Sequence, residues 1–165
     1  MAGLWAEAFP QRIPHLVLVG APALRPMPAQ GVRIKEWRLA APGPQRDAIH
    51  RHNLRQMMFA HEQTADALAL KIHAENMDRD RLRRRKLART DALVQLLPRL
   101  QARVDGIWGA ADALYTGALD VVATALRHAP GFGRLVLIPD AGHWVQHEAP
   151  EVFNPALLDL LGAAA

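Results

Sequence analysis

The 165-residue sequence predicts an α/β fold with about three parallel strands and flanking helices, and two observations support this prediction. First, three short apolar runs each end at a glycine or proline, which is typical of buried strands in a parallel sheet. These runs are HLVLVG (15–20), VDGIWG (104–109) and LVLIP (135–139). Second, helical patterns lie between and after them, and such alternation indicates α/β layers with right-handed crossovers.

Helical patterns flank the predicted strands at three places. One precedes the first strand at 2–9, one separates the second strand from the third at 116–129, and one closes the chain at 150–161. Proline at the start of the last pattern suits the first turn of a helix.

The middle of the chain interrupts this rhythm, because no strand is predicted between about residues 25 and 100. Turn-rich segments frame helical patterns there, such as 46–63 and 64–77. We therefore expect a helical insertion in a small sheet. The expected divisions are a core fragment at 1–24, a helical cap at 25–100 and a C-terminal core at 101–165.

Composition narrows the class of protein. Half of the residues are apolar and the net charge is only +4, which indicates a soluble globular domain. No apolar run approaches the roughly 20 residues that span a bilayer, and the N-terminus lacks a secretory pattern, so we expect a cytoplasmic protein without a membrane partner. The absence of cysteine excludes disulfides and thiolate metal sites. We expect neither a metal site nor a cofactor.

The densest basic run, RDRLRRRKLAR at 79–89, has two interpretations. It could bind phosphates of a nucleic acid, or it could be a solvated helix face. In the second case the buried stripe would be formed by Leu82, Leu93, Leu96, Leu97 and Leu100. We favour the solvated face, because no aromatic residue lies beside the run to stack on bases. Nucleic-acid binding stays the weaker alternative.

An acid and an imidazole follow two of the predicted strands at their carboxyl ends. Asp112 comes after the strand at 104–109, and His143 comes after the strand at 135–139. Ligands of open α/β sheets bind beyond these ends, and a carboxylate beside a histidine can orient it as a base. We therefore predict Asp112 and His143 as catalytic residues.

The other acidic residues near the strands suit this role less well. Asp105 begins its strand, so it should lie at the opposite end of the sheet, and Asp120 falls inside a helix pattern. Asp140 occupies a turn, where aspartate usually serves the backbone. Glu148 is expected in the first turn of the final helix, where the helix dipole would explain it.

Histidines in the insertion do not form a metal motif. His50 and His52 should face different sides of a helix, and no His-Glu-x-x-His spacing occurs.

At the acid and the histidine, the sequence resembles the C-terminal part of the α/β-hydrolase fold. IWGAAD (107–112) is similar to the segment that carries the family's triad acid, and IPDAGHWVQHEAPEVFN (138–154) to the segment that carries its triad histidine. The resemblance assigns the acid to Asp112 and the base to His143. It also matches residues 1–24 to the helix and strand after the nucleophile, and residues 25–100 to a helical cap.

The resemblance implies an ester or carbon–carbon bond hydrolase for a small apolar substrate. The Gly-His-Trp ending and the long cap are similar to those of meta-cleavage-product hydrolases and related esterases. An apolar substrate pocket under the cap would include Trp144, Met57, Met58 and Phe59, for each of which core packing is the alternative role.

The family's Gly-x-Ser-x-Gly elbow is missing, and the chain contains no serine and no cysteine. By the match, the nucleophile is expected about four or five residues before Met1. A serine there would imply ester, amide or carbon–carbon hydrolysis, and an aspartate would imply dehalogenation or epoxide opening. Thr116 lies near Asp112, but a threonine nucleophile relies on a free N-terminal amine. We therefore expect Thr116 to cap the following helix instead.

We therefore expect a C-terminal fragment of an α/β-fold hydrolase that is inactive by itself. The alternative, from another class, is a non-catalytic interaction module. Its first strand, HLVLVG, would leave an open edge for a second copy or a partner strand.

Overall fold

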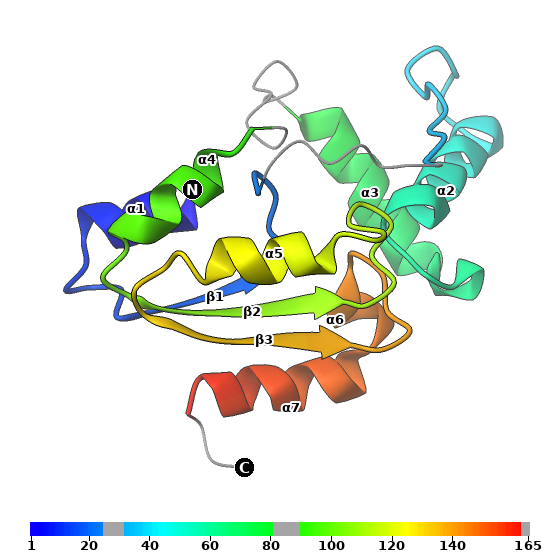
Figure 1. Cartoon of the computed structure of the whole chain (residues 1–165). Helices are drawn as coiled ribbons and strands as arrows, with labels where there is room; N and C mark the ends of the chain where they lie inside the picture. The colour runs from blue at the N-terminus through cyan, green and yellow to red at the C-terminus, as the bar shows by residue number, and fades with distance from the viewer. Residues whose placement is uncertain (25–31, 81–89, 163–165) are drawn as a thin grey trace.

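The computed structural model of the chain describes residues 1–24, 32–80 and 90–162, and it contains the predicted parallel sheet (Figure 1). The strands are β1 (His15–Val19), β2 (Arg103–Gly109) and β3 (Phe132–Ile138). They pair in parallel in the order β1-β2-β3, so β2 is central. The α/β fold class and the three strands are thus confirmed.

The three strands differ in burial, which corrects one expectation. Every residue of β2 after Arg103 is buried, as a central parallel strand requires. β1 alternates between buried and half-buried residues. The prediction of two buried faces is wrong for β3, because it lies at an edge of the described sheet and its Leu137 is 43% exposed.

Helices cover both faces of the sheet (Figure 1). One face carries α1 (Ala2–Ala8), α4 (Ala92–Leu96) with the 3₁₀ turn η3 (Leu97–Arg99), and α5 (Leu119–Leu126). The other face carries α7 (Pro150–Leu160).

Alternate residues of each strand serve these two layers, as the period of two in a strand dictates. Leu18 and Trp108 pack in the cluster that includes α1, α4 and α5 residues. Ile107 packs with Phe153 of α7 in the second cluster, against which Val19 also lies. The two clusters therefore pack against the strands from both faces of the sheet.

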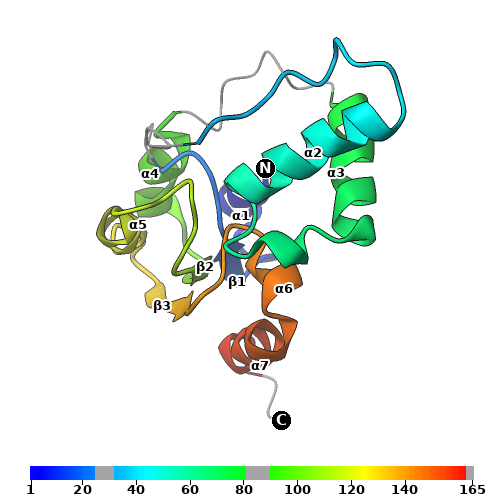
Figure 2. The same cartoon turned by 90° about the vertical axis from the view of Figure 1, so that its right-hand side faces the viewer.

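A helical unit lies beyond the carboxyl ends of the strands (Figures 1 and 2). It consists of α2 (Pro44–Met57), the 3₁₀ turn η1 (Glu62–Thr64) and α3 (Ala67–Arg79). Figure 2, seen from those strand ends, places α2 and α3 away from α4 and α5. No helix in the described ranges is long and apolar enough to cross a membrane.

The basic run at 79–89 lies outside the described residues, apart from Arg79 and Asp80. The helix expected there, with Leu82 in its buried stripe, and the nucleic-acid alternative therefore stay predictions. Leu96, Leu97 and Leu100 of the same expected stripe are buried, but they belong to the short α4, to η3 and to the residue after it.

Asp105 lies at the amino end of β2, away from the end that carries Asp112, as the sequence predicted. Its buried carboxylate accepts hydrogen bonds of 2.7 Å from His15 Nε2, Arg103 Nε and the Arg134 amide. Burial opposes ionisation, but these hydrogen bonds, led by that of Arg103, lower the pKa of Asp105. The residue joins all three strands, which is a structural role.

Candidate active site

The structure brings the predicted acid and base together. The His143 Nδ1–Asp112 Oδ2 distance is 2.8 Å, and the Asp112 side chain is fully buried. A carboxylate only accepts hydrogen bonds, so Nδ1 of a neutral imidazole carries the proton and Nε2 keeps its lone pair. The other oxygen, Asp112 Oδ1, accepts the Leu114 amide at 2.9 Å, which orients the carboxylate.

Backbone hydrogen bonds join the turn that carries the acid to the turn that carries the histidine. The Ala110 amide donates to the Ile138 carbonyl, and the Ala111 amide donates to the Ala141 carbonyl. Gly109 makes this approach possible, since a Cβ at that position would overlap the carbonyl oxygens of Ala141 and Gly142. The backbones of the two turns are therefore directly hydrogen-bonded to each other.

The loop after β1 forms the third side of the site. The Gly20 amide donates to the Ile107 carbonyl, and the Tyr115 hydroxyl donates to the Ala21 carbonyl at 2.7 Å. Burial, with a smaller effect of Asp112, raises the pKa of Tyr115 to about 12, so the hydroxyl keeps its proton. The ends of all three strands thus meet around His143.

The remaining hydroxyl near the acid does not approach the imidazole. Thr116 Oγ1 contacts the carbonyl oxygens of Asp112 and Ala113 at 3.5 and 3.4 Å. Its expected role as a helix cap is wrong, because α5 begins after Ala118 and has no side-chain cap. No described hydroxyl bonds to His143 Nε2, so the pair Asp112–His143 is complete only on its acid side.

The predicted pocket residues lie in and around a packed cluster. Phe59 is 4% exposed and its ring meets the Trp144 ring edge to face, with centroids 5.6 Å apart. Met58 packs against the same cluster, whereas Met57 ends α2 half-buried. These four residues do not line the cavity beside Pro44 and Arg51 or the cavity beside Val94 and Asp120. Their contact with a substrate stays a prediction.

Sequence reasoning missed Glu148. It is not in the final helix, where the helix dipole was expected to explain it, but ends the one-turn α6 (Val145–Glu148) before α7 begins. Its carboxylate accepts a hydrogen bond from the Gly142 amide, directly before His143. Its place in the segment 138–154, which resembles the family's histidine segment, was the one signal. That signal did not reveal the contacts, because three further donors to the carboxylate lie 84 to 88 residues away in the chain.

Gly20 offers a test of how tightly the imidazole is held. Its φ is +49°, and a Cβ there would lie 3.2 Å from His143 Cε1 and 3.3 Å from Nδ1. Gly20→Ala is expected to cost about 1–2 kcal/mol of folding free energy through the left-handed backbone. It should also displace the imidazole and weaken the Nδ1–Asp112 hydrogen bond. Urea unfolding and the ¹⁵N resonances of the His143 ring measure the two effects.

The matched control is Gly162→Ala. Gly162 also has positive φ, at +70°, but nothing lies within 4 Å of its Cβ position. This variant should lose a similar free energy and leave the His143 resonances unchanged. Equal His143 spectra in both variants would contradict the contact.

Comparisons with known proteins were made on sequence and on structure. A scan against models of protein families found no match, and a search of curated proteins found none either. Several solved structures are similar. One is a meta-cleavage product hydrolase from Pseudomonas fluorescens IP01, with 16% identity and a TM-score of 0.67 over 99% of this chain and 61% of that one.

Two further structures are similar to the chain. The 2-hydroxy-6-oxo-6-phenylhexa-2,4-dienoate hydrolase from Rhodococcus sp. strain RHA1 has 18% identity and a TM-score of 0.62, over 99% of this chain and 62% of its own. A bacterial membrane phospholipase A has 19% identity and a TM-score of 0.61, over 98% of this chain and 53% of its own. Identities this low show the fold alone.

The comparisons agree with the topology of the sheet. The chain spans about three fifths of the length of the hydrolases from Pseudomonas and Rhodococcus. It aligns over nearly its whole length with each of them, and its three parallel strands carry an acid and a histidine at their carboxyl ends. The chain therefore has part of the α/β-hydrolase fold.

Proposed function

We propose that the chain supplies the acid and the histidine of a hydrolase active site, and that the nucleophile comes from polypeptide outside these 165 residues. One observation carries the proposal. Asp112 and His143 form a 2.8 Å pair at the carboxyl ends of neighbouring parallel strands, with Nε2 unbonded within the described residues. This is the arrangement of a carboxylate that fixes the tautomer of a histidine base.

His143 and Asp112 have different roles in the proposed reaction. His143 Nε2 takes the proton of the nucleophile while that atom attacks the substrate carbon, and then returns the proton to the leaving group. Asp112 keeps the other ring proton on Nδ1 and stabilises the imidazolium that forms. Nε2 then takes a proton from a water molecule, whose oxygen displaces the product from the nucleophile, and returns that proton to the nucleophile.

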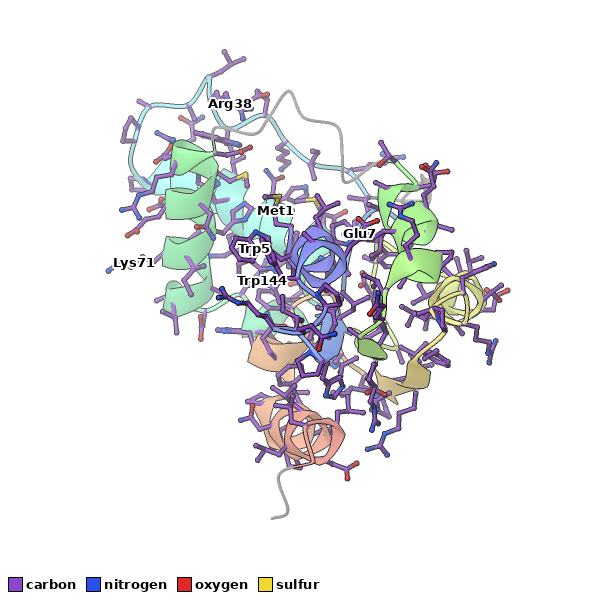
Figure 3. The ribbon with its side chains drawn as sticks, turned by 90° about the vertical axis from the view of Figure 1, so that its left-hand side faces the viewer. Met1, Trp5, Glu7, Arg38, Lys71 and Trp144 are labelled. Atoms are coloured by element: carbon purple, nitrogen blue, oxygen red, sulfur yellow. The ribbon has the colours of Figure 1, made fainter. Side chains whose placement is uncertain are left out.

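Two observations support a nucleophile outside this chain. The sequence contains no serine and no cysteine, and no described threonine hydroxyl bonds to His143. The surface also has room for more chain: Leu4 and Trp5 of α1 are about half exposed, and Figure 3 shows Trp5 on the side of α1 that faces α2 and α3. Exposed apolar side chains beside a sheet edge favour a further packed layer.

A small apolar ester, or a ketone cleaved at a carbon–carbon bond, is the proposed substrate class. The similar structures include meta-cleavage product hydrolases. Trp144 directly follows the proposed base in the chain and packs with Phe59 in an apolar cluster of the helical unit. An apolar cluster this near the base in the chain favours an apolar substrate with few polar groups.

The 165-residue chain is expected to hydrolyse p-nitrophenyl esters no faster than its own His143→Ala variant. Triad members act as a unit, so an acid and a base without a nucleophile retain little of the rate enhancement. The variant controls for slow esterolysis by the other histidines. Release of nitrophenolate at neutral pH measures both rates.

The companion experiment extends the reading frame upstream of Met1. We expect an in-frame Gly-x-Ser-x-Gly, or an aspartate at the same place, and ester or carbon–carbon hydrolysis by the longer protein. His143-dependent turnover by the 165-residue chain would contradict a nucleophile outside it. An extended frame without any nucleophile would instead favour the interaction module, for which the open edge of β1 is the supporting observation.

A further inference from the structure

The carboxylate of Glu148 is the most heavily bonded side chain near His143. Oε2 accepts hydrogen bonds from the amides of Gly142 at 2.6 Å and Ala60 at 3.0 Å. Oε1 accepts from the His61 amide at 2.8 Å and from the Thr64 hydroxyl at 3.2 Å. Four donors on one carboxylate, two for each oxygen, form a strong and directional contact, because hydrogen bonds to a charged group exceed neutral ones in strength.

These donors come from two distant parts of the chain. Ala60, His61 and Thr64 belong to the segment 58–64 that follows α2, whereas Gly142 belongs to the turn that carries His143. Glu148 therefore connects the helical unit beyond the sheet with the histidine turn.

Other contacts between the same two parts leave little freedom. The Trp144 amide donates to the Met58 carbonyl at 2.9 Å. A Cβ on Gly142 would lie 2.7 Å from the Ala60 amide nitrogen and 2.8 Å from the Met58 carbonyl oxygen, so the backbones touch there. The Ala141–Gly142 peptide is thus bonded to Glu148 and the His143–Trp144 peptide to segment 58–64, so the turn is held before and after His143.

The position of the imidazole follows from this arrangement. Asp112 fixes the ring through Nδ1, but a ring bond alone does not hold the Cα from which the ring projects. Glu148 fixes the Gly142 amide, one residue before His143, and the Met58 carbonyl accepts from the Trp144 amide directly after it, so the backbone that carries the His143 side chain is held from both directions. The ring is oriented by one carboxylate and its backbone by another.

We infer that Glu148 is a positioning residue, which holds the His143 turn against segment 58–64 and so keeps the imidazole in line with Asp112. The role of Glu148 in catalysis rests on the proposed function of His143 as a base. The contact acts on His143 through the backbone and touches neither substrate nor reacting atoms. It also makes the orientation of the imidazole depend on the docking of the helical unit.

Glu148→Gln in the 165-residue chain tests this inference. A side-chain amide has one oxygen and one NH₂ group, so it serves only one of the two donor pairs and places N–H groups against the other. Amide hydrogen exchange at Gly142 or His61 should become roughly ten- to a hundredfold faster. The Nδ1 proton of His143, observed by NMR, should shift or broaden, because its bond to Asp112 weakens.

The matched control is Glu151→Gln, the same change three residues further on, at an exposed position in the first turn of α7. It should leave the Gly142 amide and the His143 ring unchanged. Glu148→Asp keeps the charge on a shorter side chain, and should restore part of the His143 signal that Glu148→Gln loses. A folded Glu148→Gln chain with an unaltered His143 ring would overturn the inference.

Thr64→Val tests the inference if Glu148→Gln does not fold. Valine has nearly the shape of threonine but lacks the hydroxyl, so the variant removes one donor to Glu148 and leaves the other three. A small shift in the same direction is expected at His61 and His143, and the absence of any shift would contradict the inference. All these signals are read without a nucleophile. A failed hydrolysis experiment therefore bears on the proposed function, and an unchanged His143 ring bears on the positioning role.

Discussion

Replacing Asp112 by asparagine is expected to lower kcat about 10⁴-fold in a hydrolase that combines this chain with its nucleophile, as the same change does in serine proteases. The asparagine oxygen can keep the Leu114 amide, which leaves the side-chain NH₂ facing His143 Nδ1. Nδ1 must then accept a hydrogen bond, so the ring proton moves to Nε2. An imidazole in that tautomer cannot take the proton of the nucleophile.

The tautomer can be read in the 165-residue chain without any turnover. The ¹⁵N spectrum of His143 should show the proton on Nδ1 in the natural sequence and on Nε2 in the Asn variant. Asp120→Asn is the control, because Asp120 lies on α5 between the same two strands and is exposed. An Asp112→Asn enzyme with undiminished kcat would contradict the proposed role of the acid.

The sheet was predictable because buried parallel strands need apolar residues on both faces. Five of the six expected positions in HLVLVG form β1, and the central strand β2 is buried as its sequence VDGIWG indicates. β3 begins at Phe132, three residues earlier than predicted, because its first residues include Arg134, which an edge strand can turn to solvent. Sequence patterns predict the ends of edge strands poorly, because the polar and glycine residues found there are also typical of loops.

The approach of Asp112 to His143 was predictable for a topological reason. Parallel neighbouring strands end at the same edge, so side chains that follow β2 and β3 must meet there. The same reasoning placed Asp105 at the other end, where it bonds to His15 and Arg103. Catalytic roles for the pair remain predictions, whereas their distance is a feature of the fold.

Contacts made by the helical unit were not predictable in this way. Glu148 meets Ala60 and His61 only because the chain after α2 packs on the histidine turn, and no local pattern encodes that packing. The sequence placed His50 and His73 in the helical insertion and gave no reason to expect that they are buried. They are buried, at 1% and 3% exposure, because α2 packs against α3. Pairwise helix packing of this kind depends on side-chain shape, which a periodicity does not contain.

Acid is expected to destabilise the packing of α2 on α3 through His50 and His73. Their rings meet edge to face, with centroids 5.3 Å apart. Among the described residues, neither nitrogen of His50 nor Nε2 of His73 has a hydrogen-bond partner. Burial, with a smaller effect of His50, lowers the pKa of His73 to about 4, and burial also lowers the pKa of His50. A charged imidazolium in this place would lack solvation.

The sign of the effect follows from proton binding. An unfolded histidine has a pKa near 6.5, so between pH 6.5 and 4 the unfolded chain binds more protons than the folded one. The free energy of unfolding therefore falls as pH falls through that range, by roughly 3 kcal/mol for His73. Arg46 opposes protonation of His50, whereas Asp47 and Asp78 favour it. These charges have smaller effects on the pKa of His50 than burial has.

His73→Leu isolates the contribution of His73 to the acid sensitivity, because leucine fills a similar space and does not titrate. Urea unfolding at pH 7 and pH 4.5 should show a clearly smaller difference for this variant than for the natural sequence. Amide exchange should locate the change in α2 and α3. His128→Leu is the control, since His128 is exposed at the end of α5 and should leave the pH dependence intact. If both variants keep the full acid sensitivity, the carboxylates of the fold, and not the buried histidine pair, are responsible for it.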